Sequence, residues 1–342
     1  MSLNLQERVS LRPFNSFGID AQAAWVAQAQ DIAGIAQAHA FARERSVPLV
    51  VLGAGSNVLF AGDFPGVVLL VALRGVAAPQ RAQGAWLVRV DAGEDWPALV
   101  QSLVAAGRGG LENLALIPGS AGAAPVQNIG AYGVELAERL HSVTIWEAAT
   151  GACRELPATE CGFGYRDSRF KRVADGAEVI VDITLRLPDP WEPVTGYAEL
   201  ERELAPLQGR ALQPADVFAA VCAIRRRKLP DPARIGNAGS FFKNPVVGRA
   251  QHAALLEHHP SLVSYPLAGG RFKIAAGWLI ESCGFKGATR GRAGVYEGQA
   301  LVLVNRGGAS GQEVLELAAA VRARVLDRFG VTLEPEVRVI AA

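Results

Sequence analysis

The sequence predicts a mixed α+β fold in two large pieces. The clearest strand is Val179–Leu187, where apolar and polar residues alternate with the period of a half-buried strand. The clearest helix begins at a capping box formed by Ser310 and Glu313 and keeps its apolar residues on one face as far as Phe329. Proline-rich punctuation at residues 230–232 stops the preceding helix, and we place the main boundary between the two pieces there.

The first piece opens with a pattern typical of a small βαβ-like unit. Asp31 is expected to cap a helix that runs to about Arg45. The apolar run Pro48–Leu52 reads as a strand, a second strand follows near Val67–Ala72, and Trp86–Asp91 alternates as a third.

Further along the first piece, two helices and a hairpin are expected. Asp95–Ala106 is predicted to be a capped helix with Pro97 in its first turn. Strands at His141–Glu147 and Cys153–Leu156 flank a turn and are typical of a hairpin. A helix that begins at Pro214 is expected to reach Lys228.

The second piece begins with a stretch that we expect to be a loop, Asn237–Pro245. Helices are predicted over Arg249–His258 and Ile274–Cys283, and a strand over Gln299–Asn305. The last predicted strand is Leu333–Ile340.

Composition excludes several classes of function. The 342 residues carry a formal net charge of +1, so no global field attracts nucleic acid or an anionic membrane. The longest apolar runs have the length of strands, and no secretory signal is visible at the N-terminus. The four cysteines lack C-x-x-C spacing and no histidine pattern indicates a metal site, so we expect reduced thiols in the cytoplasm and no bound metal.

Two glycine-rich stretches are the strongest indication of a ligand. Ile117–Gly133 reads IPGSAGAAPVQNIGAYG, and GAGSN at Gly53–Asn57 follows a predicted strand. Such loops let the backbone approach a ligand closely and offer peptide N–H groups to phosphate. Neither has the G-x-G-x-x-G pattern of a Rossmann unit. The pair favours a dinucleotide-sized ligand, and the alternative is two tight turns in a packed protein.

Four groups of polar residues could carry chemistry, and each has a simpler alternative. Ser240 could donate a proton to a very basic carbon centre, or it could only shape its loop. Glu336 and Arg338 would share one face of the last strand, as an oriented acid beside a guanidinium or as a surface ion pair. Arg166 could stabilise a carboxylate or form a structural bridge to Asp167. The cations of residues 225–228 could bind phosphate or form a solvated helix end.

In combination and in this order, the motifs resemble the UDP-N-acetylenolpyruvoylglucosamine reductase family of bacterial cell-wall synthesis. The motifs are GAGSNVL, IPGSAGAAPVQNIGAYG, YRDSRFK, LPDP, GNAGSFFKNP and LEPEVR, and the resemblance runs from Phe14 to the C-terminus. A tyrosine in an insertion after the Val179 strand, Tyr197, is similar to the subclass with a tyrosine-bearing substrate loop.

The resemblance implies an α+β architecture with an FAD-binding region of the vanillyl-alcohol-oxidase type and a C-terminal α+β substrate-binding domain. We expect a first FAD-binding subdomain at residues 1–74, joined by the C-terminal strand 331–342. A second subdomain would cover residues 75–228, with the substrate loop near 190–200, and the substrate-binding domain residues 229–330.

The resemblance also implies the reaction: NADPH reduces FAD, and hydride then passes to the enolpyruvyl double bond of UDP-N-acetylglucosamine enolpyruvate, giving UDP-N-acetylmuramate. Such an enzyme, a UDP-N-acetylmuramate dehydrogenase, supports peptidoglycan synthesis and with it cell shape and division. In the matching positions, Ser240 would protonate the carbanion, Arg166 would stabilise charge on the substrate carboxylate, and Glu336 would assist as an acid or hydrogen-bond donor.

The same matching implies the binding residues. The residues expected to line FAD are Gly53, Ala54, Gly55, Ser56, Asn57, Pro118, Gly119, Ala123, Gly130 and Ile180. The residues expected to hold the UDP-sugar are Tyr197, Lys228 and Asn244, with contributions from Tyr132, Arg225, Gln299 and Arg338. Ala54 and the pair Ala123–Ala124 depart from the family pattern, and the pair removes a hydroxyl contact to the flavin.

The expected partners are the UDP-sugar and NADPH, with no nucleic acid, no membrane and no metal, and the expected state is a monomer. Two other functions compete with the reductase: a UDP-sugar-binding protein without redox chemistry, and an FAD-domain oxidase that uses oxygen. The set of Ser240, Arg166 and Glu336 argues against the first, and the motifs SFFKNP and LEPEVR argue against the second.

Overall fold

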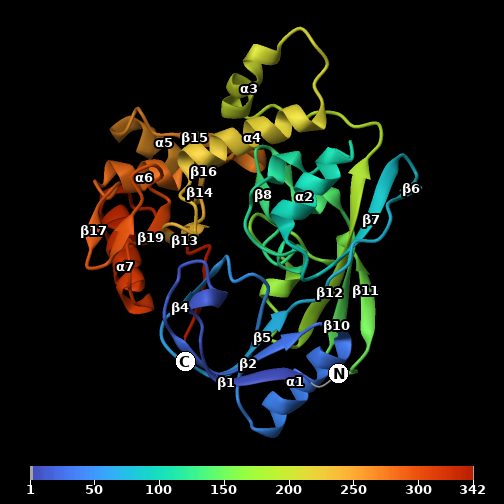
Figure 1. Ribbon diagram of the computed structural model, residues 1–342. Coiled ribbons are helices and arrows are strands. Elements are labelled where there is room, and N and C mark those ends of the chain that lie inside the picture. Colours follow the sequence, from blue (N-terminus) through green and yellow to red (C-terminus); the bar gives the residue numbers. More distant parts are fainter. Residues whose placement is uncertain (1–2, 342) are drawn as a thin grey trace. The chain divides into compact units, whose positions relative to one another are not determined.

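The computed structural model describes residues 3–341, and in it the chain forms two compact units (Figure 1). Unit 1 contains the stretch up to Val9, Ala23–Gly55 and Pro65–Arg227. Unit 2 contains Ser10–Gln22, Ser56–Phe64 and the stretch from Lys228 onward. The finer division into three domains stays a prediction.

Unit 1 is built on two larger sheets, and it also contains the short antiparallel pair of β8 (Gly130–Ala131) and β9 (Val134–Glu135). The first has the strand order β1-β2-β5-β3, with β3 parallel to β5. Its strands are β1 (Asn4–Ser10), β2 (Gln22–Ala29), β3 (Leu49–Leu52) and β5 (Phe64–Val71). The second sheet has the order β11-β10-β12-β7-β6 and is antiparallel. Its strands are β6 (Gln80–Ala82), β7 (Ala85–Asp91), β10 (Leu140–Glu147), β11 (Cys153–Pro157) and β12 (Glu178–Pro188).

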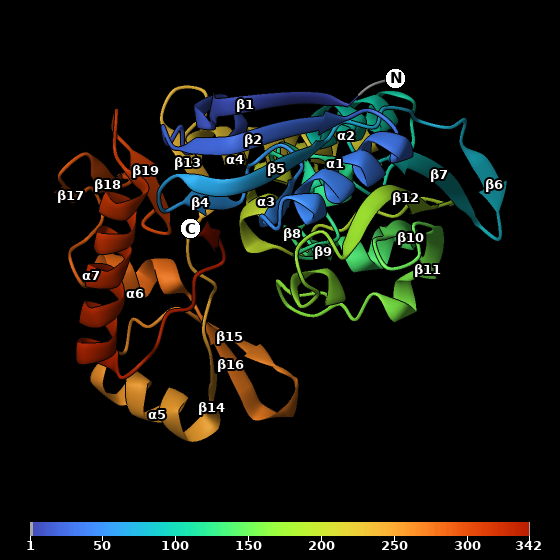
Figure 2. The same cartoon turned by 90° about the horizontal axis from the view of Figure 1, so that it is seen from below.

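Four helices complete unit 1, and α1 lies beside the first sheet in Figure 2. They are α1 (Ile32–Glu44), α2 (Trp96–Ala105), α3 (Ala198–Leu204) and α4 (Pro214–Lys228, whose last residue belongs to unit 2). Asp31 and Asp95 cap α1 and α2 as predicted, each accepting a backbone N–H of the first turn, from Gly34 and Ala98. Apolar residues from both sheets and from these helices form one buried core.

One polar residue of β12 departs from the predicted alternation. Asp182 was expected on the solvent side but is only 3% exposed. Its carboxylate accepts hydrogen bonds from Arg89 at 2.7 Å and Thr144 at 2.9 Å. These bonds compensate the loss of water, which is what allows a carboxylate to be buried.

Unit 2 contains two small antiparallel sheets and a parallel pair. The larger sheet has the order β13-β19-β18-β17, with β13 (Gly236–Ser240), β17 (Thr289–Arg290), β18 (Ala293–Val295) and β19 (Val302–Asn305). The other has the order β14-β16-β15, with β14 (Val246–Gly248), β15 (Ser264–Leu267) and β16 (Arg271–Ile274). The C-terminal strand β20 (Arg338–Ile340) pairs in parallel with β4 (Val58–Phe60).

The helices of unit 2 are α5 (Arg249–His258), α6 (Ala276–Ser282) and α7 (Gly311–Phe329), and α7 runs beside α6 and strands β18 and β19 (Figure 2). The predicted capping box of Ser310 and Glu313 is present at the start of α7, and Gly330 ends the helix with φ of 62°. No helix in residues 3–341 combines the length and hydrophobicity that a bilayer crossing requires.

Candidate functional site

The residues predicted for the site fall into two sets, one in each unit, and each set is described by itself. Unit 1 holds Gly53, Ala54, Gly55, Pro118, Gly119, Ala123, Gly130, Tyr132, Arg166, Ile180, Tyr197 and Arg225. Unit 2 holds Ser56, Asn57, Lys228, Ser240, Asn244, Gln299, Glu336 and Arg338.

In unit 1 the two glycine-rich loops face each other. Gly53 follows strand β3, and a Cβ at this position would clash with Ser120 Oγ and lie 3.2 Å from the Cβ of Ala123. Gly55 and Gly119 have φ of 62° and 147°, a region that side-chain-bearing residues rarely adopt. The loops therefore come together because they carry so few side-chain atoms.

Ser120 is a candidate that sequence reasoning missed. It is 5% exposed, and within the described chain its Oγ has no hydrogen-bond partner. Buried hydroxyls normally have one, so an unsatisfied hydroxyl between two glycine-rich loops fits a polar group that binds there. The sequence did offer an indication, because Ser120 is the only serine in the stretch Ile117–Gly133.

Backbone hydrogen bonds fix the second loop. Gly119 O accepts from Trp96 N at 3.0 Å, and Ala121 N donates to Glu94 O at 2.8 Å. Ile180 of β12 is 8% exposed and is part of the core of the same unit. The loop is thus a rigid part of unit 1 that is bonded to the start of helix α2.

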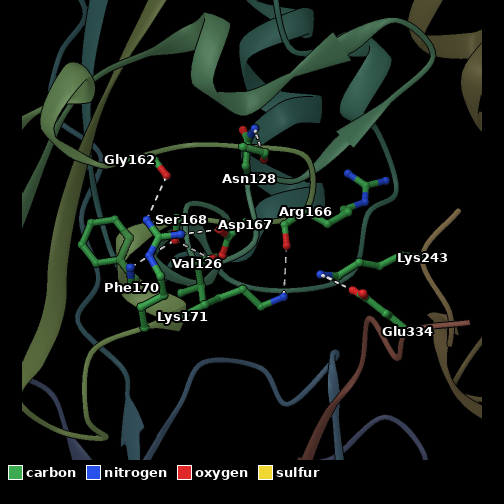
Figure 3. Close-up of polar contacts among 12 residues, drawn as sticks. Val126, Asn128, Gly162, Arg166, Asp167, Ser168, Phe170, Lys171, Lys243 and Glu334 are labelled. Atoms are coloured by element: carbon green, nitrogen blue, oxygen red, sulfur yellow. Dashed lines mark hydrogen bonds and ion pairs between the residues drawn. The ribbon is translucent and has the colours of Figure 1, made fainter. Parts of the chain in front are cut away.

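Arg166 contacts the end of the glycine-rich stretch through its guanidinium, and Figure 3 shows its carbonyl bonded to Lys171. Its Nη2 donates to Gly130 O at 2.7 Å, and a Cβ on Gly130 would lie 3.1 Å from Nη1. Its backbone has φ of 52°, and its carbonyl accepts from Lys171 Nζ at 3.1 Å. The carboxylate of Asp167 pairs with Arg172. A glycine at position 130 therefore allows the guanidinium to approach the loop.

A second arginine of unit 1 lies close to Arg166. Burial, the largest cause, and the charge of Arg166 both lower the pKa of Arg225, and Arg225 hydrogen-bonds to Tyr132. Among the described residues, Arg225 Nε is a buried donor with no acceptor. Two neighbouring guanidiniums, one with an unsatisfied donor, form a site suited to an anion. The predicted cation run is thus divided: Arg225 points inward, whereas Arg227 forms an exposed ion pair with Glu203.

Tyr132 and Tyr197 form a pair beside Arg225. Their ring centroids are 5.3 Å apart in an edge-to-face arrangement. Burial raises the pKa of Tyr132 to about 12, so its hydroxyl is protonated at neutral pH. Tyr197 is 42% exposed and directly precedes helix α3. This pair offers an aromatic surface next to a cationic one.

In unit 2, Ser240 occupies the end of strand β13 and not a loop. The prediction of a loop over Asn237–Pro245 is wrong for its first half, because this backbone pairs with β19. The register shifts between Asn237 and Ser240, where Gly239 has φ of 68° and donates its N–H to Asn237 Oδ1 at 2.9 Å. Bulges of this kind redirect a side chain. The residues after Ser240 are anchored, since Phe241 and Phe242 are each 1% exposed.

Glu336 lies next to this segment. Its N–H donates to Phe241 O at 2.8 Å, and its side chain is largely buried. Asn57 Nδ2 donates to Glu336 O at 3.4 Å, and Arg338 N donates to Asn57 O at 3.1 Å. Two backbone hydrogen bonds and one from the Asn57 side chain therefore connect Asn57, Glu336 and Arg338 to the residue that follows Ser240.

The predicted final strand Leu333–Ile340 is shorter in the structure. Only β20, from Arg338, forms a regular ladder, so Glu336 precedes the strand and does not share its face with Arg338. Pro335, which forms an isolated bridge with Phe242, has no N–H to donate and cannot sustain a ladder. Before it, Glu334 O accepts from Lys243 N at 2.9 Å, and the two side chains form the 3.8 Å ion pair drawn in Figure 3.

Of three further predicted residues in unit 2, Asn244 and Gln299 lie at the start of α6, and Lys228 lies near Gly298. Asn244 Oδ1 accepts the first backbone N–H of α6 at 2.9 Å. A Cβ on Gly277, in the first turn of the helix, would lie 2.9 Å from Gln299 Oε1. Lys228 contributes its carbonyl, which would lie 3.2 Å from a Cβ on Gly298. Asn244 and Gln299 thus both lie at the start of α6.

Comparison with known proteins agrees with this architecture. Residues 231–340 match the family described as UDP-N-acetylenolpyruvoylglucosamine reductase, C-terminal domain, and residues 23–156 match the FAD binding domain family. The chain is 53% identical over 329 residues to the UDP-N-acetylenolpyruvoylglucosamine reductase of Paraburkholderia xenovorans (strain LB400), covering 95% of each chain. It is 52% identical over 337 residues to that of Burkholderia pseudomallei (strain 1710b), covering 98% of this chain and 97% of the relative.

Among solved structures, the UDP-N-acetylenolpyruvylglucosamine reductase of Thermus caldophilus aligns over 99% of both chains, with 25% sequence identity and a TM-score of 0.67. Together with the FAD binding domain match, this confirms the predicted fold class, an α+β protein with an FAD-binding region of the vanillyl-alcohol-oxidase type and a C-terminal substrate domain.

Proposed function

Because the chain belongs to the UDP-N-acetylenolpyruvoylglucosamine reductase family, we propose that it reduces UDP-N-acetylglucosamine enolpyruvate to UDP-N-acetylmuramate. It is an FAD-dependent oxidoreductase of peptidoglycan precursor synthesis, and NADPH is its reductant. The single observation that best supports the protonation step is the bulge at Gly239, which shifts the register of β13 directly before Ser240 and so changes the direction of its side chain.

The facing glycine-rich loops of unit 1 fit the cofactor. Gly53 lets the two loops approach each other, the positive φ of Gly55 and Gly119 lets their backbone turn toward a dinucleotide, and the unsatisfied Ser120 hydroxyl offers it a hydrogen bond. The other residues assigned to this role are Ala54, Ser56, Asn57, Pro118, Ala123, Gly130 and Ile180. When bound, FAD accepts hydride from NADPH and supplies it to the enolpyruvyl double bond.

The protein supplies the proton. An alcohol is a weak acid that gives up its proton only to a strongly basic acceptor, which is what hydride addition creates on the substrate. Ser240 Oγ–H donates to the substrate carbon that does not receive hydride, forming the new C–H bond, and the oxygen regains a proton from solvent. Glu336, held beside the residue after Ser240, acts as an acid or hydrogen-bond donor.

The positive groups of unit 1 hold and polarise the substrate. Arg166 stabilises the charge that develops on the substrate carboxylate, an interaction of the kind whose loss costs about 10²–10³ in rate. Arg225, Tyr132 and Tyr197 bind the UDP-sugar with the anion site and aromatic surface described above. The residues assigned to substrate binding from unit 2 are Lys228, Asn244, Gln299 and Arg338. We also propose that the protein is a cytoplasmic monomer, and that its chain divides into three domains with boundaries after residues 74 and 228.

The test follows the two half-reactions separately under anaerobic conditions. We expect purified protein to show oxidised-flavin absorption, NADPH to bleach it, and UDP-N-acetylglucosamine enolpyruvate to restore it with formation of UDP-N-acetylmuramate. Protein that binds the UDP-sugar but carries no flavin and consumes no NADPH would contradict the reductase. Reoxidation only by oxygen, with peroxide as product, would indicate an oxidase instead.

A further inference from the structure

Two consecutive buried residues of unit 1 hold the segment that carries Tyr197. Glu112 and Asn113 are 1% and 0% exposed and begin a short 3-10 helix, Glu112–Leu114. The segment they hold, Trp191–Tyr197, contains no helix or strand. Its geometry must therefore come from side-chain contacts and not from a backbone ladder.

Asn113 connects this segment to Tyr132. Its Nδ2 donates two hydrogen bonds of 2.8 Å, one to Tyr132 O and one to Val194 O. Both amide hydrogens are thus used, one on each side. The Asn113 side chain therefore holds the backbone of Tyr132 itself. It also holds the backbone of Val194, three residues before Tyr197.

Glu112 provides the second attachment. Its Oε1 accepts from the indole Nε1 of Trp191 at 2.7 Å, and its Oε2 accepts from Gly110 N at 2.5 Å. Hydrogen bonds to a carboxylate are about twice as strong as neutral ones. A Cβ on Gly109 would overlap the Trp191 indole, so the absence of a side chain there makes room for the ring.

The two tyrosines depend on this arrangement. Tyr132 has φ of 49° and Gly133 has φ of 88°, an unfavourable turn for a tyrosine that its bonded carbonyl helps to hold. A Cβ on Gly133 would lie 3.3 Å from Val194 Cγ1, so the turn and the segment are in contact. The rings of Tyr132 and Tyr197 then meet at 5.3 Å.

We infer that Glu112 and Asn113 are positioning residues for substrate binding, which anchor the segment before Tyr197 and keep it beside Tyr132, where both tyrosines can contact the UDP-sugar. The inference rests on the proposed function, because it requires these tyrosines to contact that substrate. Neither residue touches the substrate, and each acts through the tyrosine segments. A segment that is attached at fewer points has more conformational freedom to lose on binding, so losing one attachment should weaken the binding of substrate.

The test uses Trp191→Phe in the full-length holoprotein. This variant keeps an aromatic ring and leaves the two hydrogen bonds of Asn113 in place, but it removes the indole hydrogen bond to Glu112 Oε1. The matched control is Trp25→Phe, which removes a 3.2 Å indole bond to Glu7 elsewhere in unit 1. For Trp191→Phe we expect KM for the UDP-sugar to rise about tenfold, the lower end of what loss of one hydrogen bond to a charged group predicts, with kcat within twofold.

Two readouts separate positioning from general destabilisation. Amide hydrogen exchange should accelerate in the peptide around residues 191–197 in Trp191→Phe but not in Trp25→Phe, and flavin content should be unchanged in both. An unchanged KM, a fall in kcat alone or an equal rise in KM with Trp25→Phe would overturn the inference. If the wild-type protein does not reduce the UDP-sugar at all, the proposed function is wrong. In that case amide hydrogen exchange still shows whether Glu112 holds residues 191–197 in place.

Discussion

The backbone N–H of Glu336 donates a 2.8 Å hydrogen bond to the carbonyl of Phe241, the residue directly after Ser240. Almost a hundred residues of sequence separate the two, yet this bond places the proposed proton donor and the proposed acid on adjacent strands of backbone. Phe241 is buried, so the connection is rigid. Small shifts of either residue would therefore be transmitted to the other.

Glu336→Gln should slow the reduction of substrate by about 10²-fold while leaving the reduction of flavin by NADPH intact. Glutamine keeps the size and the backbone bond but cannot give up a proton, and general acids contribute typically 10²–10⁴ in rate. Single-turnover kinetics of each half-reaction measure this. The matched control is Glu334→Gln, since Glu334 lies two residues away with a side chain 72% exposed, and we expect wild-type rates from it. If Glu336→Gln and Glu334→Gln reduce substrate at the same rate, Glu336 is not an acid in the reaction.

Ser240→Ala should have the sharpest effect on the second half-reaction. Without the hydroxyl the carbanion must take its proton from a poorly placed donor such as solvent, so we expect bleaching by NADPH at the normal rate and recovery of flavin absorption slowed about 10²-fold or more. Ser240→Cys, which restores an acidic hydrogen, should recover part of the rate. If Ser240→Ala reoxidises as fast as the wild type, another group supplies the proton.

Gly53→Ala should weaken the binding of FAD, because the added Cβ clashes with Ser120 Oγ in the facing loop. Ser120→Ala alone should also weaken it, about fivefold to tenfold, through loss of one hydrogen bond. Its effect on stability should be small, because Ser120 Oγ has no partner to lose in the described protein.

The double variant Gly53→Ala with Ser120→Ala tests whether the two loops meet as described. It should bind FAD better than the sum of the single effects predicts, since the clash is removed, although Ala123 Cβ stays 3.2 Å away. Titration of apoprotein with FAD gives the three affinities. Strict additivity would contradict the contact between the loops.

Local patterns predicted the fold well where sequence-adjacent residues determine it. The caps of α1 and α2, the box at Ser310 and the bounds of α5 all follow from such residues. Asp182 could not be predicted, because it is buried only through partners on the two neighbouring strands. The predicted length of the final strand was also wrong. Its pairing depends on Phe242, a residue distant in sequence that lies opposite Pro335.

The candidate site was only partly predictable for the same reason. Motif matching identified Ser240, Arg166 and Glu336 as candidates, but the bulge at Gly239 depends on pairing with β19 and is not legible in the local sequence. Ser120 and Asn113 were missed, because their importance lies in what they face across the fold.

Tyr132→Phe should reveal the raised pKa of Tyr132 through the pH dependence of stability. The native pKa is about 12, raised chiefly by burial, and the unfolded value is about 10. A pKa that is higher in the native state gives stability that is complete below pH 10 and is lost as the pH rises toward 12. At pH 8 the variant should be less stable than the wild type, because it lacks the hydrogen bond to Arg225. Between about pH 10 and pH 11 the difference should narrow, because only the wild type loses this contribution. Urea midpoints of both proteins from pH 8 to pH 11 measure it, and a constant difference over that range would mean that Tyr132 titrates normally.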